Sequence, residues 1–177
     1  KEAATWFKKV GKRKEAAAEM AKAGQQVKAA ALFLKEGDFI TAAQLYAEKG
    51  KHAKAAAAFL KAGDRARSAA SYAKAGKLLD AAKTYVDYFH TAPDELAVQV
   101  QHAEACFQML QSPPAAKRVP PEVRRTLLPL IATRFEQGQR HEAAANLFLE
   151  GGELVKAGEA FVRAGLFEKA AECMRQA

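Results

Sequence analysis

The sequence predicts an all-α fold, an α-solenoid of stacked antiparallel helical hairpins with no strands, and three observations support it. Glycine recurs at a strict 13-residue interval, and a fixed period of this kind indicates a stack of repeated units. Small residues lie five and six positions after each glycine, and a bulky residue lies nine after it. These offsets fall on one face of a helix with 3.6 residues per turn. The glycines are Gly11, Gly24, Gly37, Gly50, Gly63 and Gly76.

Each unit is predicted to be one short helix that ends at the next glycine. A glycine just past a helix end adopts the left-handed conformation that closes the turn. A helix of roughly ten residues is unstable alone in water, so the units must pack on one another. The predicted core residues are Met20, Phe33, Tyr46, Phe59, Tyr72 and Tyr85.

Alternate units differ, which raises the repeat to a 26-residue hairpin, twice the glycine interval. Leu34 and Leu60 lie ten positions after Gly24 and Gly50, where the units after Gly37 and Gly63 have alanine. Those two units carry Asp38 and Asp64 directly after the glycine. We expect about 12 to 13 helices in all, with each hairpin burying its apolar stripe against its neighbours.

The glycine period divides the chain into three predicted parts. Regular repeats occupy residues 1–89, an irregular helical insertion occupies 90–137, and repeats resume over 138–177. Together these parts are expected to form one continuous solenoid, and the alternative is two short solenoid blocks joined by the proline connector.

The insertion is predicted to contain two helices. Thr91 and Pro93 suit a helix start, with acidic residues in the first turn, and that helix should run to Gln111. The four prolines of residues 112–121 predict an exposed connector. A second helix over residues 122–137 should kink near Pro129.

The resumed repeats are predicted to start at Gly138. One extra residue at Gly151 then accounts for a single 14-residue step to Gly152, and Gly165 follows at the regular interval. The predicted small pairs are Ala143 with Ala144, Ala157 with Gly158, and Ala170 with Ala171, and the predicted core residues are Leu147, Phe148, Phe161, Val162 and Met174.

The two ends of the sequence fit the interior of a repeat array. Ala3, Ala4 and Phe7 match the offsets of a unit whose glycine would precede Lys1, and Ala177 falls one position before an expected glycine. The chain is therefore expected to be a piece of a longer repeat protein, with other domains of that protein among its partners.

Positive charge is concentrated in the first half of the chain. The net charge is +8, but residues 1–90 hold 18 Lys and Arg against 9 Asp and Glu, whereas residues 91–177 hold 10 against 11. A basic surface attracts acidic proteins, nucleic acids or anionic membranes. The alternative is that lysine only keeps an alanine-rich surface soluble. The nominated partner-binding residues are Lys12, Arg13, Lys14, Lys51, Lys54, Arg65 and Arg67.

Signals for catalysis, cofactors or metal are weak, so the sequence predicts no enzyme. His102 and Cys106 share a helix face, but no third group completes a catalytic or zinc constellation. The two cysteines, Cys106 and Cys173, do not form a disulfide framework, which favours a cytoplasmic setting. No run of about 20 apolar residues indicates a membrane span.

Two segments, residues 42–50 and 157–165, carry a small-residue and aromatic pattern that resembles tetratricopeptide-like repeats. The units also look like the short-helix solenoids of coat and intraflagellar-transport scaffolds. Their 26-residue period is shorter than the ~34 residues of a standard tetratricopeptide repeat, and the tryptophan and closing proline of that family are absent from the units. The resemblance implies a protein-binding solenoid without a peptide-carboxylate clamp.

Three functions follow as hypotheses. The favoured one is a non-catalytic scaffold that binds a partner protein or peptide, and the basic residues favour an acidic one. The alternatives are a basic module for nucleic acid or anionic membranes and a purely structural spacer. Nucleic acid is the weaker alternative because the repeated aromatics are predicted to be buried and cannot stack on bases.

Overall fold

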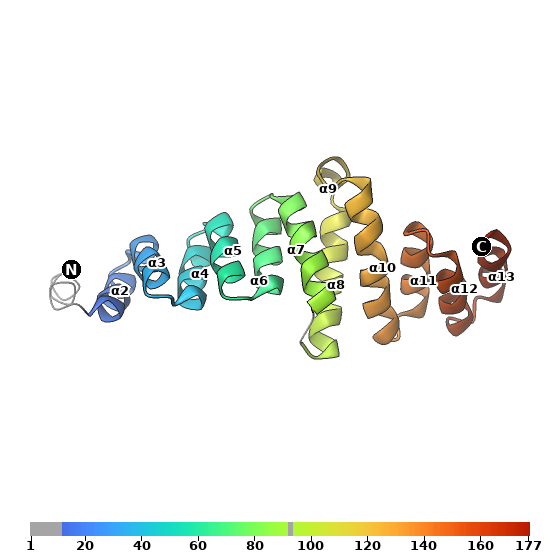
Figure 1. Cartoon of the computed structure of the whole chain (residues 1–177), viewed down its shortest axis with the longest axis horizontal. Coiled ribbons are helices and arrows are strands. Elements are labelled where there is room, and N and C mark those ends of the chain that lie inside the picture. Colours follow the sequence, from blue (N-terminus) through green and yellow to red (C-terminus); the bar gives the residue numbers. More distant parts are fainter. Residues whose placement is uncertain (1–11, 92–93) are drawn as a thin grey trace. The chain divides into compact units, whose positions relative to one another are not determined.

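The computed structural model describes residues 12–91 and 94–177, and these ranges contain helices and no strand (Figure 1). The unit predicted around Ala3, Ala4 and Phe7 lies outside the described residues, as does Pro93. The helices are α2 (Arg13–Lys22), α3 (Gln26–Lys35), α4 (Phe39–Glu48), α5 (His52–Lys61), α6 (Arg65–Lys74), α7 (Leu78–Thr91), α8 (Leu96–Gln111), α9 (Pro113–Arg118), α10 (Pro121–Gln137), α11 (His141–Glu150), α12 (Leu154–Arg163) and α13 (Phe167–Gln176).

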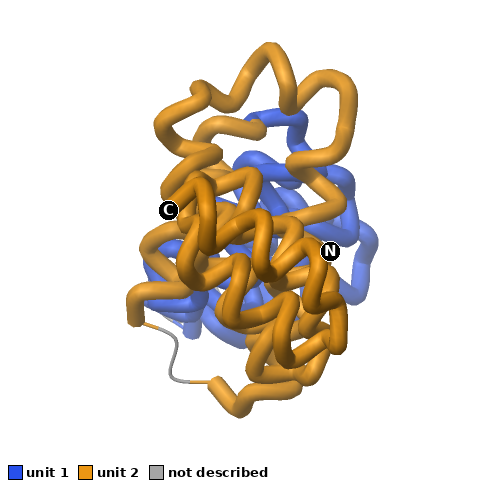
Figure 2. Tube along the Cα trace, turned by 90° about the vertical axis from the view of Figure 1, so that its right-hand side faces the viewer, with its two compact units in different colours: residues 1–77 blue, residues 78–177 orange. Residues whose placement is uncertain are grey.

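The chain divides into two compact units, of which unit 1 ends at Lys77 and unit 2 begins at Leu78 (Figure 2). In unit 1, each of the helices α2 to α6 has ten residues and packs against the next one along the chain. In unit 2, α10 to α13 pack in the same sequential way. Sequential packing of short helices is the arrangement of a helical solenoid.

A single turn type sets the glycine period. Gly50 adopts a φ of 67°, and its N–H donates to the carbonyl of Ala47 at 2.9 Å. The N–H of Lys51 donates to the carbonyl of Tyr46 at 2.8 Å. These two bonds form a Schellman motif. Because Lys51 is also the N-cap of α5, only a three-residue turn separates consecutive helices, and the same pair of bonds recurs at Gly24, Gly37, Gly63 and Gly76.

The core of unit 1 consists of the predicted small pairs and bulky residues. Both residues of each pair in α2 to α5 are fully buried, which lets neighbouring helices approach closely. Met20, Phe33, Tyr46 and Phe59 are buried as predicted, whereas Tyr72 is only half-buried.

The aspartates that mark alternate units are N-caps. Asp38 Oδ1 accepts a hydrogen bond from the N–H of Thr41 at 3.1 Å, and Asp64 Oδ1 accepts one from the N–H of Arg67 at 2.9 Å. Each bond satisfies an otherwise unpaired N–H of a helix first turn. Helices α4 and α6 therefore differ from α3 and α5 in having an aspartate side chain that caps their first turn.

The first part of unit 2 is a packed helix cluster. Helix α10 contacts α7 and α8 as well as α11, and α9 contacts α7 and α8. Arg134 of α10 donates to Gln99 Oε1 of α8 at 2.8 Å and to the carbonyl of Phe89 in α7 at 2.7 Å. Leu127, Ile131 and Phe135 of α10 are fully buried, so this helix forms the centre of the cluster.

Two details of the predicted insertion are wrong. Thr91 is the last residue of α7 rather than a helix start, and α8 begins at Leu96 with Glu95 as its N-cap. Residues 112–121 are largely exposed, as predicted. They are not merely a connector, however, because Pro113–Arg118 form α9 and the side chains of Ala115 and Val119 are buried. Proline at the first helical positions is compatible with a helix start, which explains how a proline-rich segment becomes helical.

The core prediction for the resumed repeats, α11 to α13, is also partly wrong. Leu147, Phe148 and Phe161 are buried, but Val162 and Met174 are 49% and 46% exposed. Ala160 and Cys173 are buried instead. Each lies one or two positions from the predicted one, so the helix face that meets its neighbour is rotated relative to our prediction.

The left-handed residue that restarts the period is Gln139 and not Gly138. Gln139 has a φ of 61° and Gly138 a φ of −81°, and the Schellman bonds form around Gln139. The step from Gln139 to Gly152 and the step from Gly152 to Gly165 both equal the regular interval. The buried small pair after Gln139 is Ala144 with Ala145. The longer step that we predicted is therefore absent here.

A Cβ at position 138 would lie 3.1 Å from Val100 Cγ2, so Gly138 allows the close approach of α8.

We expect the replacement Gln139→Gly to stabilise unit 2 by about 0.5–1 kcal/mol. The left-handed conformation is strained for an L-residue, and this gain exceeds the extra backbone entropy of glycine in the unfolded chain. Urea unfolding monitored by circular dichroism measures the change. The reverse replacement, Gly152→Gln, should cost about 1 kcal/mol; equal stability of both variants and wild type would contradict the strain argument.

Candidate functional site

The seven nominated basic residues all lie in unit 1, at the starts of three helices. Lys12, Arg13 and Lys14 begin α2, Lys51 and Lys54 begin α5, and Arg65 and Arg67 begin α6. All are exposed except the half-buried Arg65. Cations at helix N-termini face the positive end of the helix dipole. The helix dipole therefore does not explain their positions.

The structure does not bring these seven residues together. Because α5 and α6 are joined by a tight reversing turn, the start of α6 lies about 15 Å along the axis from the start of α5. Lys51 and Lys54 thus lie at one end of this hairpin, and Arg65 and Arg67 at the other.

Three of the seven already have intramolecular partners. Arg13 pairs with Glu36 at 3.4 Å, and Arg67 pairs with Asp64. Lys54 Nζ lies 5.7 Å from the ring centroid of Tyr46. Within the described residues Lys12, Lys14, Lys51 and Arg65 form no ion pair.

A recurrent cation–π contact explains the positions of Lys54 and Arg67. In four junctions a lysine or arginine in the first turn of a helix lies over an aromatic ring near the end of the preceding helix, eight positions earlier. The sequence carries this signal, and our prediction missed it. The pairs are Lys54 with Tyr46, Arg67 with Phe59, Lys156 with Phe148 and Lys169 with Phe161.

A basic depression lies beside the start of α5. It has a volume of about 480 Å³ and is lined by the turn at Gly50, the first residues of α5, and the end of α6. Its charged or titratable lining residues are Lys51, His52, Lys54 and Lys74, and none is acidic. Lys74 is far from Lys51 in sequence, so only the antiparallel hairpin brings them together. Nothing in the sequence alone places Lys74 beside Lys51 and Lys54.

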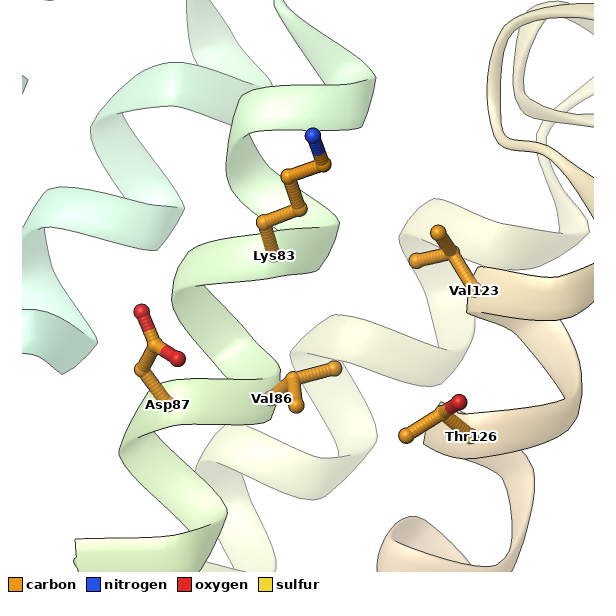
Figure 3. Close-up of a pocket in the computed structure, with 5 residues that line it drawn as sticks. All are labelled: Lys83, Val86, Asp87, Val123 and Thr126. Carbon is orange, nitrogen blue, oxygen red and sulfur yellow. The ribbon is translucent and has the colours of Figure 1, made fainter.

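Unit 2 has a second depression of about 320 Å³ between α7 and α10 (Figure 3). Val86 and Val123 supply apolar surface from the two helices, and Lys83, Asp87 and Thr126 supply polar groups. Lys83 and Asp87 carry opposite charges one helical turn apart. Its lining therefore lacks the uniform charge of the depression in unit 1.

His102 and Cys106 both lie on α8 in unit 2, where His102 is half-buried and Cys106 is buried. Cys106 is fully buried, and this burial raises the pKa of its thiol far above the usual range. Burial likewise raises the pKa of the Tyr85 hydroxyl. His102 packs edge-on against the Tyr88 ring, with centroids 5.2 Å apart. A protonated, buried thiol is a poor nucleophile.

Comparison with known proteins gives no match to a family model, a curated protein or a solved structure. The described part of the chain has no group of three His, Cys, Asp or Glu side chains placed to hold a metal ion. Over residues 12–91 and 94–177, none of the helices combines the length and apolar character needed to cross a membrane.

Proposed function

We propose that this protein is a non-catalytic, tetratricopeptide-like scaffold that binds an acidic partner protein through unit 1. The observation that carries the proposal is the basic depression at the start of α5, where Lys51, Lys54 and Lys74 meet with no acidic residue in the lining. Such a concave patch attracts and orients carboxylate groups. The proposed partner presents clustered Asp or Glu side chains.

Two further features support a protein partner in the cytoplasm. Phe33, Tyr46 and Phe59 are buried in the core of unit 1, so they are not available to stack on bases as a single-strand nucleic-acid surface requires. Cys106 and Cys173 are free and buried, which suits a reducing compartment.

The test compares two variants with the same change in charge. The first is Lys51→Glu with Lys74→Glu, because neither side chain makes an ion pair in the described residues. The control is Lys117→Glu with Arg125→Glu, two exposed cations of unit 2. Each protein is used as bait in a nuclease-treated lysate at physiological salt, and captured proteins are identified by mass spectrometry.

We expect an acidic protein to be captured by wild type and by the control, and at least tenfold less by the reversed depression. If wild type captures nothing, the scaffold proposal fails and the spacer hypothesis is favoured. Recovery only of nucleic acid or lipid, when nuclease is omitted, would support the alternative basic module, whose affinity should fall steeply as salt rises.

A further inference from the structure

Helices α3 and α5 of unit 1 carry the same pattern on their exposed side. Apolar residues occupy positions three, seven and ten after the preceding glycine, and lysines occupy positions four and eleven. Positions three, seven and ten fall on one helix face. The apolar residues are Val27, Ala31 and Leu34 in α3 and Ala53, Ala57 and Leu60 in α5, and the lysines are Lys28 and Lys35 in α3 and Lys54 and Lys61 in α5.

These apolar side chains lie outside the fully buried core. Val27 is 36% and Leu60 is 46% exposed. Ala31 and Ala57 are also exposed, whereas Leu34 and Ala53 are half-buried. The opposite face of each helix holds the buried small pair and Phe33 or Phe59. Leu34 also packs against the core cluster, whereas the exposed members of the stripe are apolar surface beyond what the core buries.

The charged residues within α3 and α5 are all positive, and Glu36, the C-cap of α3 next to Lys35, pairs with Arg13 instead. Neither α3 nor α5 contains an acidic residue. Within the described residues Lys28, Lys35, Lys54 and Lys61 form no ion pair, although Lys54 also lies over the Tyr46 ring. In the described part of unit 1, no carboxylate therefore neutralises these lysines through an ion pair.

The corresponding positions in unit 2 are different. Leu149 of α11 lies ten positions after Gln139, Val155 of α12 lies three positions after Gly152, and both are exposed. The charged residues beside them are acidic or form ion pairs. Lys156 pairs with Glu153 at 3.1 Å, and Arg163 pairs with Glu136. Among the helices compared, the combination of an apolar stripe with lysines outside ion pairs is therefore a property of α3 and α5.

The two helices occupy equivalent places in successive hairpins, because Gly24 and Gly50 are separated by one hairpin repeat and both helices pack on α4. We propose that the α3/α5 stripe is a docking surface for an amphipathic helix of a partner protein, with leucine-like residues in its centre and glutamates or aspartates along its edges. Charge complementarity selects this occupant, because four lysines border the apolar residues. This inference rests on the proposed function and specifies the partner.

The experiment uses three labelled synthetic peptides of about 18 residues, which is long enough to form a helix of several turns. One is an amphipathic helix with leucines at positions i, i+4 and i+7 and glutamates beside them. The second has the same composition in scrambled order, and the third has lysine in place of glutamate.

Binding is measured by fluorescence anisotropy to wild type, to Val27→Gln with Leu60→Gln, and to the control Leu149→Gln with Val155→Gln. The four replaced side chains are 36% to 52% exposed. Circular dichroism should therefore show unchanged folding in both variants.

We expect the acidic amphipathic peptide to bind wild type and the control equally, and the stripe variant about tenfold more weakly. The scrambled and basic peptides should bind at least tenfold more weakly than the acidic amphipathic one. Equal binding of amphipathic and scrambled peptides, with no effect of the stripe variant, would overturn the docking surface while the acidic-partner scaffold stands. A second outcome is that no peptide binds. If the lysate capture still depends on Lys51 and Lys74, only the docking surface is refuted. If that capture is lost as well, the docking surface and the proposed scaffold function are both refuted.

Discussion

Replacement of Phe135 by alanine is expected to destabilise unit 2 by about 3–5 kcal/mol. Phe135 is fully buried in α10, and its ring lies perpendicular to that of Phe107 with centroids 5.9 Å apart. The guanidinium carbon of Arg140 lies over the same ring, 4.1 Å from its centroid. The variant therefore loses apolar burial, an aromatic pair and a cation–π contact together. Urea unfolding followed by circular dichroism gives the loss, and hydrogen exchange assigns it to unit 2.

The matched control is Phe167→Ala in α13. Phe167 is 67% exposed, so its removal should change the free energy of unfolding by less than about 0.5 kcal/mol. Losses of similar size in the two variants would mean that Phe135 is not at the centre of the helix cluster.

The regular repeats could be predicted from the sequence because each structural feature there depends on one residue type. A left-handed turn favours glycine, close helix packing favours alanine, and a single bulky residue fills the space between helices. At Gly50, for example, the period, the turn and the following helix start are all set within a three-residue segment.

The irregular features could not be predicted because tertiary packing decides them. Gln139 adopts the left-handed conformation that glycine adopts at the other turns. The glycine pattern of the sequence therefore predicts this turn at Gly138, one residue too early. Ala115 and Val119 are buried because α9 packs on α7 and α8. Their local sequence, rich in proline, indicates only a surface segment.

The candidate site was predicted in part, for a related reason. Charge composition identified Lys51 and Lys54, but Lys74 joins them only through the antiparallel pairing of α5 and α6. Leu34 and Leu60 were visible as the feature that distinguishes alternate units, yet their exposure depends on which helix face the neighbours cover. Periodicity gives the spacing of a stripe, and packing decides whether it faces the core or the solvent.

The close approach of α5 and α6 leads to the second large expected effect. Ser68 is fully buried, and its Oγ donates to the carbonyl of Ala56 in α5 at 2.9 Å. The two helix backbones are therefore separated by little more than one small side chain. Replacement Ser68→Leu should destabilise unit 1 by at least about 3 kcal/mol, because overpacking adds to the lost hydrogen bond.

Ser68→Ala separates these two causes. Alanine occupies the equivalent position in α3, α4 and α5, as Ala29, Ala42 and Ala55, and each is fully buried. The replacement should therefore cost only about 1 kcal/mol, the net contribution of one hydrogen bond. Both variants are measured by urea unfolding, with hydrogen exchange to assign the loss to unit 1. A leucine variant as stable as the alanine variant would contradict close packing of α5 and α6, because a leucine side chain fits only where the helices can move apart.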